Sequence, residues 1–458
     1  MKHRELYEIL REEIKPALGC TGPIAVCYCA AEAYDAIGGE ILSIDAILDW
    51  CMSAKIDDVA FPGSQMLGTE MAVALGAVCG DPAAGLEVLH TVTPEGELKA
   101  RKVAELVTIK PQWDLQDLGI YCDITVHTDK GTGRAVVSQR SDGLILKEKN
   151  GEILVEREPD VSAQSGKLPI LKYKVRDFYD MVTSLDSQEL EFLKDAAAYN
   201  TRLANATLEN RLGAGIGYEL YHSGHQNYIT RAKAYAAAGC EARMSGVNSP
   251  AMTCGNKGNV GIAASMPLVS LAKDVNADEE SLLRGIAMSY LVAISIIHRI
   301  GKSPSMCSCE VAAALGISAG ATLMRNGTYE QVAAAMQNTI PNVFGVVCDG
   351  AKLACALRIS SGTGIALECS DLALKGVRLA NNQGVLGATV DDSIEIIGKT
   401  ALYAMVGSDR ELSRSLFEKR KIFPLTTFEE RQKQEERKYG RETGCHLRRR
   451  GGGSRHGR

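Results

Sequence analysis

The sequence predicts a mainly α-helical protein with an inserted α/β module, so that a helical catalytic domain is combined with a small antiparallel-sheet domain. Its 458 residues are too many for one ordinary hydrophobic core. Aromatic residues make up only 5% of the chain, and Gly and Ala are abundant, which suits closely packed helices. Residues 121–156 alternate polar and apolar side chains, whereas the segments on either side have helical periodicity.

Residues 1–88 are predicted to form the N-terminal part of the helical domain. Residues 4–15 form an amphipathic pattern that ends at a proline. A loop follows, and Pro23 suits the first turn of a second helix over 24–36. Helical patterns continue over 43–88.

Residues 89–175 are predicted to form the inserted α/β module. Glycines separate short alternating segments, which is typical of antiparallel strands joined by tight turns. Residues 96–108 supply a helix that packs on this sheet. The expected strands are 121–127, 134–138, 144–147 and 153–156.

Residues 176–428 are predicted to form the main part of the helical catalytic domain, because helical periodicity returns there. Residues 429–458 form a basic tail, which we expect to be disordered. The formal net charge of −5 gives no reason to expect nucleic acid as a partner. Small residues on the helices are compatible with a homodimer.

The sequence favours a cytoplasmic location. The first residues contain no apolar segment of the kind found in secretion signals. The longest apolar stretch, around 289–297, is shorter than the roughly 18 residues that a membrane span needs. The 14 cysteines are therefore expected to be thiols, and several of them should be buried as small apolar residues.

Two loops carry candidate reactive or binding residues. Cys20 precedes a predicted helix start, where unpaired N–H groups and the helix dipole favour the thiolate. The alternative is a small buried residue in a tight turn, and the spacing alone does not separate the two. In the second loop, glycines and amides suit the binding of a carboxylate, although a Gly-rich helix start is an equal alternative. Its candidate residues are Asn256, Lys257, Gly258 and Asn259.

Two further loops carry candidate metal-binding cysteines. Cys307 and Cys309 precede an Ala-rich helix, and Cys348 and Cys355 lie seven residues apart after it. One straight helix would separate the latter pair by about 10.5 Å along its axis, which is wide for one compact cluster. A turn at Asp349 could bring them closer. Three thiolates would suit an iron–sulfur cluster with one open iron, and packing cysteines are the alternative.

Several motifs in a fixed order resemble a known family. The run from Lys15 to Ala25 is similar to the N-terminal signature of the L-cysteine desulfidases, which belong to the superfamily of iron–sulfur L-serine dehydratase alpha chains. The resemblance covers roughly residues 5–406. It continues through Ala238-Gly239-Cys240, the Gly255–Gly261 loop, Cys307–Val311 and Cys348–Cys355. Two departures, Gly22 and the sequence Thr253–Asn259, leave L-cysteine and L-serine both open as substrates.

The resemblance implies a [4Fe–4S] cluster held by Cys307, Cys348 and Cys355, with Cys309 as a competitor of Cys307. It also implies that Cys20 is the catalytic base, that Thr21 and the glycine-rich loop bind a small amino acid, and that no pyridoxal phosphate is used. The expected reaction is β-elimination of L-cysteine to sulfide, pyruvate and ammonia. The alternatives are L-serine dehydration with the same cluster and a non-enzymatic zinc protein. Ser64, Ser360 and Ser361 are weaker candidates for polar contacts.

Overall fold

The computed structural model describes residues 2–19, 21–114, 120–159, 169–301, 304–420, 427, 429, 430 and 433. It is mainly helical with one larger sheet, which confirms the predicted fold class. The predicted tail, 429–458, lies outside the described residues except at three positions. The α-helices are α1 (Lys2–Glu12), α2 (Thr21–Ile37), α3 (Trp50–Lys55), α4 (Thr69–Cys79), α5 (Pro94–Ala104), α6 (Val175–Ser184), α7 (Leu193–Asn210), α8 (Ile216–His222), α9 (Tyr228–Met244), α10 (Gly258–Val275), α11 (Glu279–Ile300), α12 (Val311–Met324), α13 (Tyr329–Val343), α14 (Cys355–Leu374), α15 (Val390–Lys399) and α16 (Val406–Arg420). Short 3-10 or π turns are η1 (Pro82–Glu87), η2 (Pro169–Lys172), η3 (Ser187–Leu190) and η4 (Thr400–Ala404).

The larger sheet has six strands in the order β3-β2-β4-β5-β6-β7. The strands are β2 (Ile41–Asp49), β3 (Val107–Gln112), β4 (Tyr121–Thr128), β5 (Gly131–Ser138), β6 (Leu144–Lys149) and β7 (Glu152–Glu156). The four predicted strands are confirmed as β4 to β7. All neighbours are antiparallel except β2 and β3, which run parallel, so the sheet is mixed and not purely antiparallel.

The helical expectation over 43–88 is wrong at β2, and the helix expected over 96–108 ends before β3 begins at Val107. The β2 segment is apolar at so many positions that periodicity alone does not separate a strand from a buried helix. Its pairing with β3 on one side and β4 on the other decides the matter. These partners lie far along the chain, so local propensity carried no sign of them.

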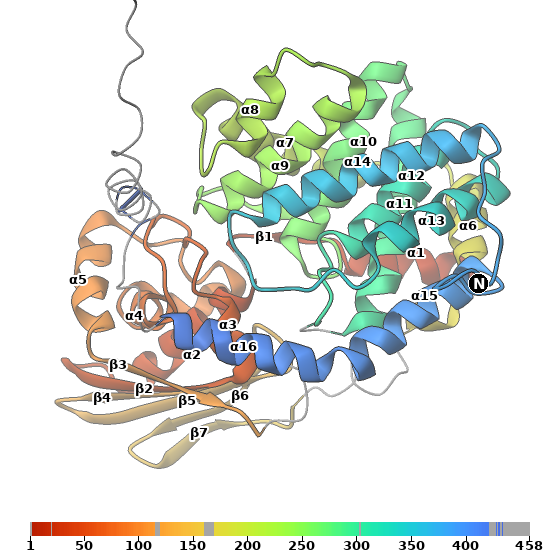
Figure 1. The fold of residues 1–458 in the computed structure, drawn as a ribbon. Helices are drawn as coiled ribbons and strands as arrows, with labels where there is room; N and C mark the ends of the chain where they lie inside the picture. The colour runs from red at the N-terminus through yellow and green to blue at the C-terminus, as the bar shows by residue number, and fades with distance from the viewer. Residues whose placement is uncertain are drawn as a thin grey trace, which may run out of the picture.

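Two large hydrophobic clusters divide the part of the chain that the structure describes. One contains buried residues of α1 and of most helices from α6 onward. The other combines α2 and α4 with the larger sheet. Helices α2 and α4, which we assigned to the helical domain, therefore pack on the sheet. Figure 1 shows them with α5 above the sheet, beside the larger group of helices, with α16 passing along both parts.

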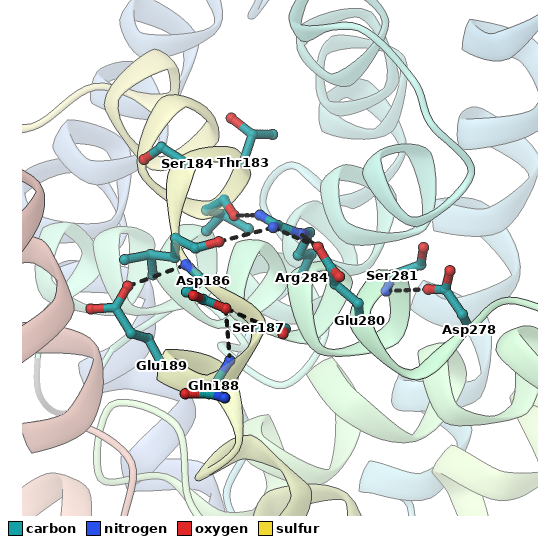
Figure 2. Close-up of polar contacts among 12 residues, drawn as sticks. Thr183, Ser184, Asp186, Ser187, Gln188, Glu189, Asp278, Glu280, Ser281 and Arg284 are labelled. Atoms are coloured by element: carbon teal, nitrogen blue, oxygen red, sulfur yellow. Dashed lines mark hydrogen bonds and ion pairs between the residues drawn. The ribbon is translucent and has the colours of Figure 1, made fainter.

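Arg284 joins α11 to the end of α6, as Figure 2 shows. Its Nη2 donates to the Leu185 carbonyl at 2.9 Å, and its Nη1 donates to the Val182 carbonyl. Glu280, one turn earlier, accepts from Nε at 2.9 Å and holds the guanidinium in place. These bonds satisfy carbonyls that the end of α6 leaves without helical partners. They contribute to a rigid frame around the core.

Helix α11 is long and apolar enough, by length and composition, to cross a membrane. The apolar stretch is thus longer than the sequence suggested. However, 78% of its most apolar window is buried inside the protein. It contacts α12 and α10 as a central helix of the larger cluster.

A two-stranded ladder attaches the N-terminal loop to the helical core. Strand β1 (Pro16–Ala17) pairs antiparallel with β8 (Ala251–Met252). The Thr253 N–H extends the ladder by donating to the Lys15 carbonyl at 2.9 Å, and the Gly255 N–H donates to the Glu13 carbonyl at 3.1 Å. The segment that leads to Cys20 is therefore held beside the glycine-rich loop.

Candidate metal and substrate site

Cys307 and Cys348 lie on two short segments that pair with each other. Met306 and Val347 form an antiparallel bridge. The Cys307 N–H donates to the Val346 carbonyl, and the Cys348 N–H donates to the Ser305 carbonyl, both at 2.8 Å. Because side chains alternate between the faces of a ladder, the two cysteines share one face as diagonal neighbours. The bridge thus brings together two thiols that are 41 residues apart in the sequence.

Cys355 reaches the same region from the first turn of α14. The chain from Cys348 to Cys355 does not continue as one straight helix, because it turns at Gly350 with φ +98°. The turn packs tightly on the end of α3: the Ala351 N–H donates to the Lys55 carbonyl at 3.0 Å. The Cys355 thiol is 3.6 Å from the Gly350 carbonyl oxygen. The turn that the sequence suggested near Asp349 is therefore present.

The surroundings of Cys307 favour its thiolate. A hydrogen bond from the Cys309 thiol, followed by the charge of Arg358, lowers the pKa of Cys307, although burial opposes this. The same bond raises the pKa of Cys309 well above its ordinary value. Arg358 is held in place by Asp349 at 2.8 Å and by the Val347 carbonyl. Of the two competing cysteines, Cys307 is therefore the one whose surroundings favour the thiolate.

Burial disfavours the thiolate forms of Cys348 and Cys355. Burial raises the pKa of both groups, that of Cys355 to about 12. Lys55 and Lys352 act in the opposite direction on Cys348. A metal that binds these thiols must displace their protons, and the nearby cations reduce the cost of gathering negative sulfur in a buried place.

The donor set suits an iron–sulfur cluster in its chemistry: three thiols on converging loops with cationic neighbours. Among the residues that the structure describes, no three His, Cys, Asp or Glu side chains form a group that could hold one metal ion. Each thiolate of a cluster binds a different iron, so the ligands of a cluster stand further apart than those of a single ion.

A buried ion pair lies next to the loop that carries Cys348 and Gly350. The Lys55 ammonium bonds to the Asp409 carboxylate of α16, and the two side chains are 7% and 1% exposed. The charge of Lys55 lowers the pKa of Cys348, and its backbone carbonyl accepts a hydrogen bond from the residue after Gly350. The sequence contained no sign of this role, since the partners are 354 residues apart.

The glycine-rich loop is a tight turn followed directly by α10. Cys254 and Lys257 form a two-residue hairpin in which Gly255 and Asn256 both have φ +58°. Two positive φ values are typical of a type I′ turn, and glycine and asparagine are the residues that adopt positive φ most readily. Asn256 is exposed at this turn, whereas Gly258 and Asn259 are buried in the first turn of α10. Of the predicted binding residues, these two face the interior.

Arg243, near the end of α9, is a residue that the sequence analysis missed. Its Nη1 donates to the Asn259 side-chain oxygen at 2.8 Å, and its Nη2 donates to the Gly19 carbonyl at 2.5 Å. It therefore connects the loop before Cys20 with the first turn of α10. The available signal was an arginine three residues after Cys240, at the end of an Ala-rich run.

Helix α9 also connects Arg243 to the cysteine group. Residues three apart on a helix are neighbours on one face, so Cys240 and Arg243 point the same way. Cys240 lies close enough to Cys355 and Cys307 for their charges to interact. The predicted cluster ligands lie near Cys240 and the glycine-rich loop lies near Arg243, one turn further along α9.

The remaining predicted residues are placed as follows. Cys20 lies outside the described residues, and Thr21 is the first residue of α2. The hydroxyl of buried Ser64 accepts from the Met66 N–H at 3.2 Å. On α14, Ser360 is buried and Ser361 is exposed.

Comparison with known proteins identifies the family. The serine dehydratase alpha chain family matches residues 83–412. The chain belongs to this family. A UPF0597 protein of Clostridium botulinum (strain Langeland) is 32% identical over 429 residues, which cover 92% of this chain and 100% of the relative. One of Clostridium tetani is 34% identical over 406 residues, covering 88% and 96%. One of Desulfatibacillum aliphaticivorans is 31% identical over 434 residues, covering 90% and 98%.

The part matched by the serine dehydratase alpha chain family contains most of the site. Cys307, Cys348, Cys355 and Arg243 all lie within residues 83–412, as does the glycine-rich loop. Cys20 and its loop precede that range. Serine dehydratases are lyases, so the expectation of an elimination reaction agrees with the family at this coarser level.

Proposed function

We propose that this member of the serine dehydratase alpha chain family is a cytoplasmic, iron–sulfur-dependent L-cysteine desulfidase. The observation that carries the proposal is the pairing of the Cys307 and Cys348 segments beside Cys355. Cysteines that only fill space in a core need no positive charges around them. Here Arg358 lowers the pKa of Cys307, and Lys55 and Lys352 lower the pKa of Cys348. We assign the cluster ligands to Cys307, Cys348 and Cys355.

In the proposed reaction, L-cysteine loses its α-proton to Cys20, and the electron pair forms a double bond to the β-carbon as the carbon–sulfur bond breaks. Sulfide leaves, and the aminoacrylate tautomerises to an imine that water hydrolyses to pyruvate and ammonia. When bound, a [4Fe–4S] cluster with one open iron supplies a Lewis acid for the leaving group. The first turn of α10 with Asn259 orients the amino acid, and Arg358 stabilises the neighbouring thiolate.

L-serine is the second candidate substrate. It is favoured by the name of the matching family, serine dehydratase alpha chain. The two reactions share the α-proton abstraction and differ only in the leaving group. The same site therefore serves both proposals, and an assay must decide between them.

The test is anaerobic reconstitution with iron and sulfide, followed by parallel assays of sulfide from L-cysteine and pyruvate from L-serine. We expect a broad brown absorbance that is lost in air and faster turnover of L-cysteine. Cys348→Ala should lose both iron and activity, whereas Cys20→Ala should lose activity and keep the colour. Cys369→Ala is the matched control, because Cys369 is buried on α14 but lies roughly 21 Å along the axis from Cys355.

Four outcomes would contradict the proposal in whole or in part. Full iron content in Cys348→Ala would reject the ligand assignment. Zinc without iron or sulfide, in protein prepared without air, would favour the non-enzymatic alternative. A discrete pyridoxal band would point to a different cofactor. Turnover of L-serine alone would keep the cluster and exchange the substrate.

A further inference from the structure

Arg243 is a buried cation without a counter-ion. Its side chain is 4% exposed, and both of its acceptors, the Gly19 carbonyl and the Asn259 amide, are neutral. Its Nε has no hydrogen-bond partner. Within the described ranges, no carboxylate lies within ion-pair distance of it, whereas the other buried cation, Lys55, pairs with Asp409. A buried charge is costly unless an opposite charge compensates it.

The guanidinium of Arg243, with its unpartnered Nε, lies against the first turn of α10. A Cβ added to Gly258 would lie 2.4 Å from Nε and 2.7 Å from Nη2, so the guanidinium packs directly against the start of α10 and only glycine fits at this position. The N–H groups of the first turn of an α-helix have no partners within the helix, and they carry the positive end of its dipole. The guanidinium and the start of α10 therefore offer donors to the same place.

We propose that Arg243 binds the carboxylate of the small amino acid, with Nε and Nη2 as the donors. Arginine binds carboxylates through two parallel hydrogen bonds; here the Nε–H has no partner, and Nη2 has a second N–H besides the one that it donates to Gly19. The identity of the ligand as an α-amino acid depends on the proposed function; the need for an anion does not. Cys240, one turn away on α9, lies near Cys307 and Cys355, so Arg243 is on the same helical face as a residue beside the cysteine group.

Asn259 offers a test that does not depend on removing the arginine. Its side-chain oxygen already accepts from Nη1 at 2.8 Å. Asn259→Asp keeps the shape of the residue and gives Arg243 a permanent counter-ion. It should raise the melting temperature and weaken the binding of an added carboxylate. A purely structural arginine would produce the first effect without the second.

The experiment measures calorimetric binding of L-alanine, which has no leaving group, to the cluster-free full-length protein. L-Alaninamide, which lacks the carboxylate, is the comparison ligand. We expect the wild type to bind L-alanine more tightly than the amide. Arg243→Lys and Asn259→Asp should each weaken L-alanine binding about 10- to 100-fold. Arg231→Lys is the matched control, because Arg231 lies on the same helix and pairs with Asp274.

Equal binding of L-alanine by wild type and Asn259→Asp would overturn the inference, and so would undetectable binding to the wild type. Because the measurement needs no cluster, it is separate from the proposed activity. A protein that binds carboxylates through Arg243 but releases neither sulfide nor pyruvate after reconstitution would refute the proposed function alone.

Discussion

Replacing Gly350 with alanine should release iron from the site without unfolding the protein. Gly350 has φ +98°, and an added Cβ would lie 2.4 Å from the Lys55 carbonyl oxygen and 2.8 Å from the Lys55 Cα. Backbone strain of this kind costs about 1–3 kcal/mol. Lengthening the contact to roughly 3.0 Å requires a movement of about 0.6 Å, which exceeds the tolerance of about 0.5 Å for a preorganised site.

The loop between Cys348 and Cys355 must absorb that movement, since Lys55 is held by its buried pair with Asp409. We expect Gly350→Ala to lose about 2–4 kcal/mol of unfolding free energy and more than half of its iron after anaerobic reconstitution. The assays are urea unfolding of the metal-free protein and iron content per chain.

The matched control is Gly376→Ala. Gly376 has φ +82° with nothing within 4 Å of an added Cβ, so it carries backbone strain without a collision. It lies beyond the far end of α14, away from the cysteines. If Gly350→Ala held as much iron as Gly376→Ala and were equally stable, the role that we assign to the contact with Lys55 would be wrong.

Three further predictions concern the same region. Asp49 caps α3, and burial raises its pKa from 3.8 to about 7. Folding therefore becomes less favourable as the pH rises through this window, by at most about 4 kcal/mol. Asp49→Asn should stabilise the protein at pH 8 and change little at pH 3.5, and equal unfolding curves at pH 8 would refute this. Lys55→Met leaves Asp409 buried and unpaired, so we expect a loss of about 3–5 kcal/mol of unfolding free energy, measured by urea unfolding. The additional change Asp409→Leu should restore much of this free energy. A double variant no more stable than Lys55→Met would count against the role of the ion pair. Cys309→Ser should keep most of the iron and Cys307→Ser should lose it, because Cys307 carries the lowered pKa; the reverse result in iron analysis would exchange the two assignments.

The sequence alone was sufficient for the fold class and for the strands from β4 to β7. Their alternation and glycine-marked turns are local signals, and the structure has strands in these places. Strand β2 was missed, because its partners β3 and β4 lie more than fifty residues away and its apolar pattern suits a helix as well. The mixed character of the sheet follows from the same distant pairing.

The sequence by itself also determined which residue types carry the chemistry: the spaced cysteines, the glycine-rich loop and the family to which they belong. Only the tertiary structure decided that Cys307 and Cys348 share one face of a ladder and that Gly350 turns against Lys55. It alone showed that the surroundings of Cys307 favour a thiolate more than those of Cys309, and it revealed Arg243 as a buried charge beside α10. The physical reason is that thiolate stability and unbalanced charge depend on partners brought together by folding, which residue spacing along one chain does not encode.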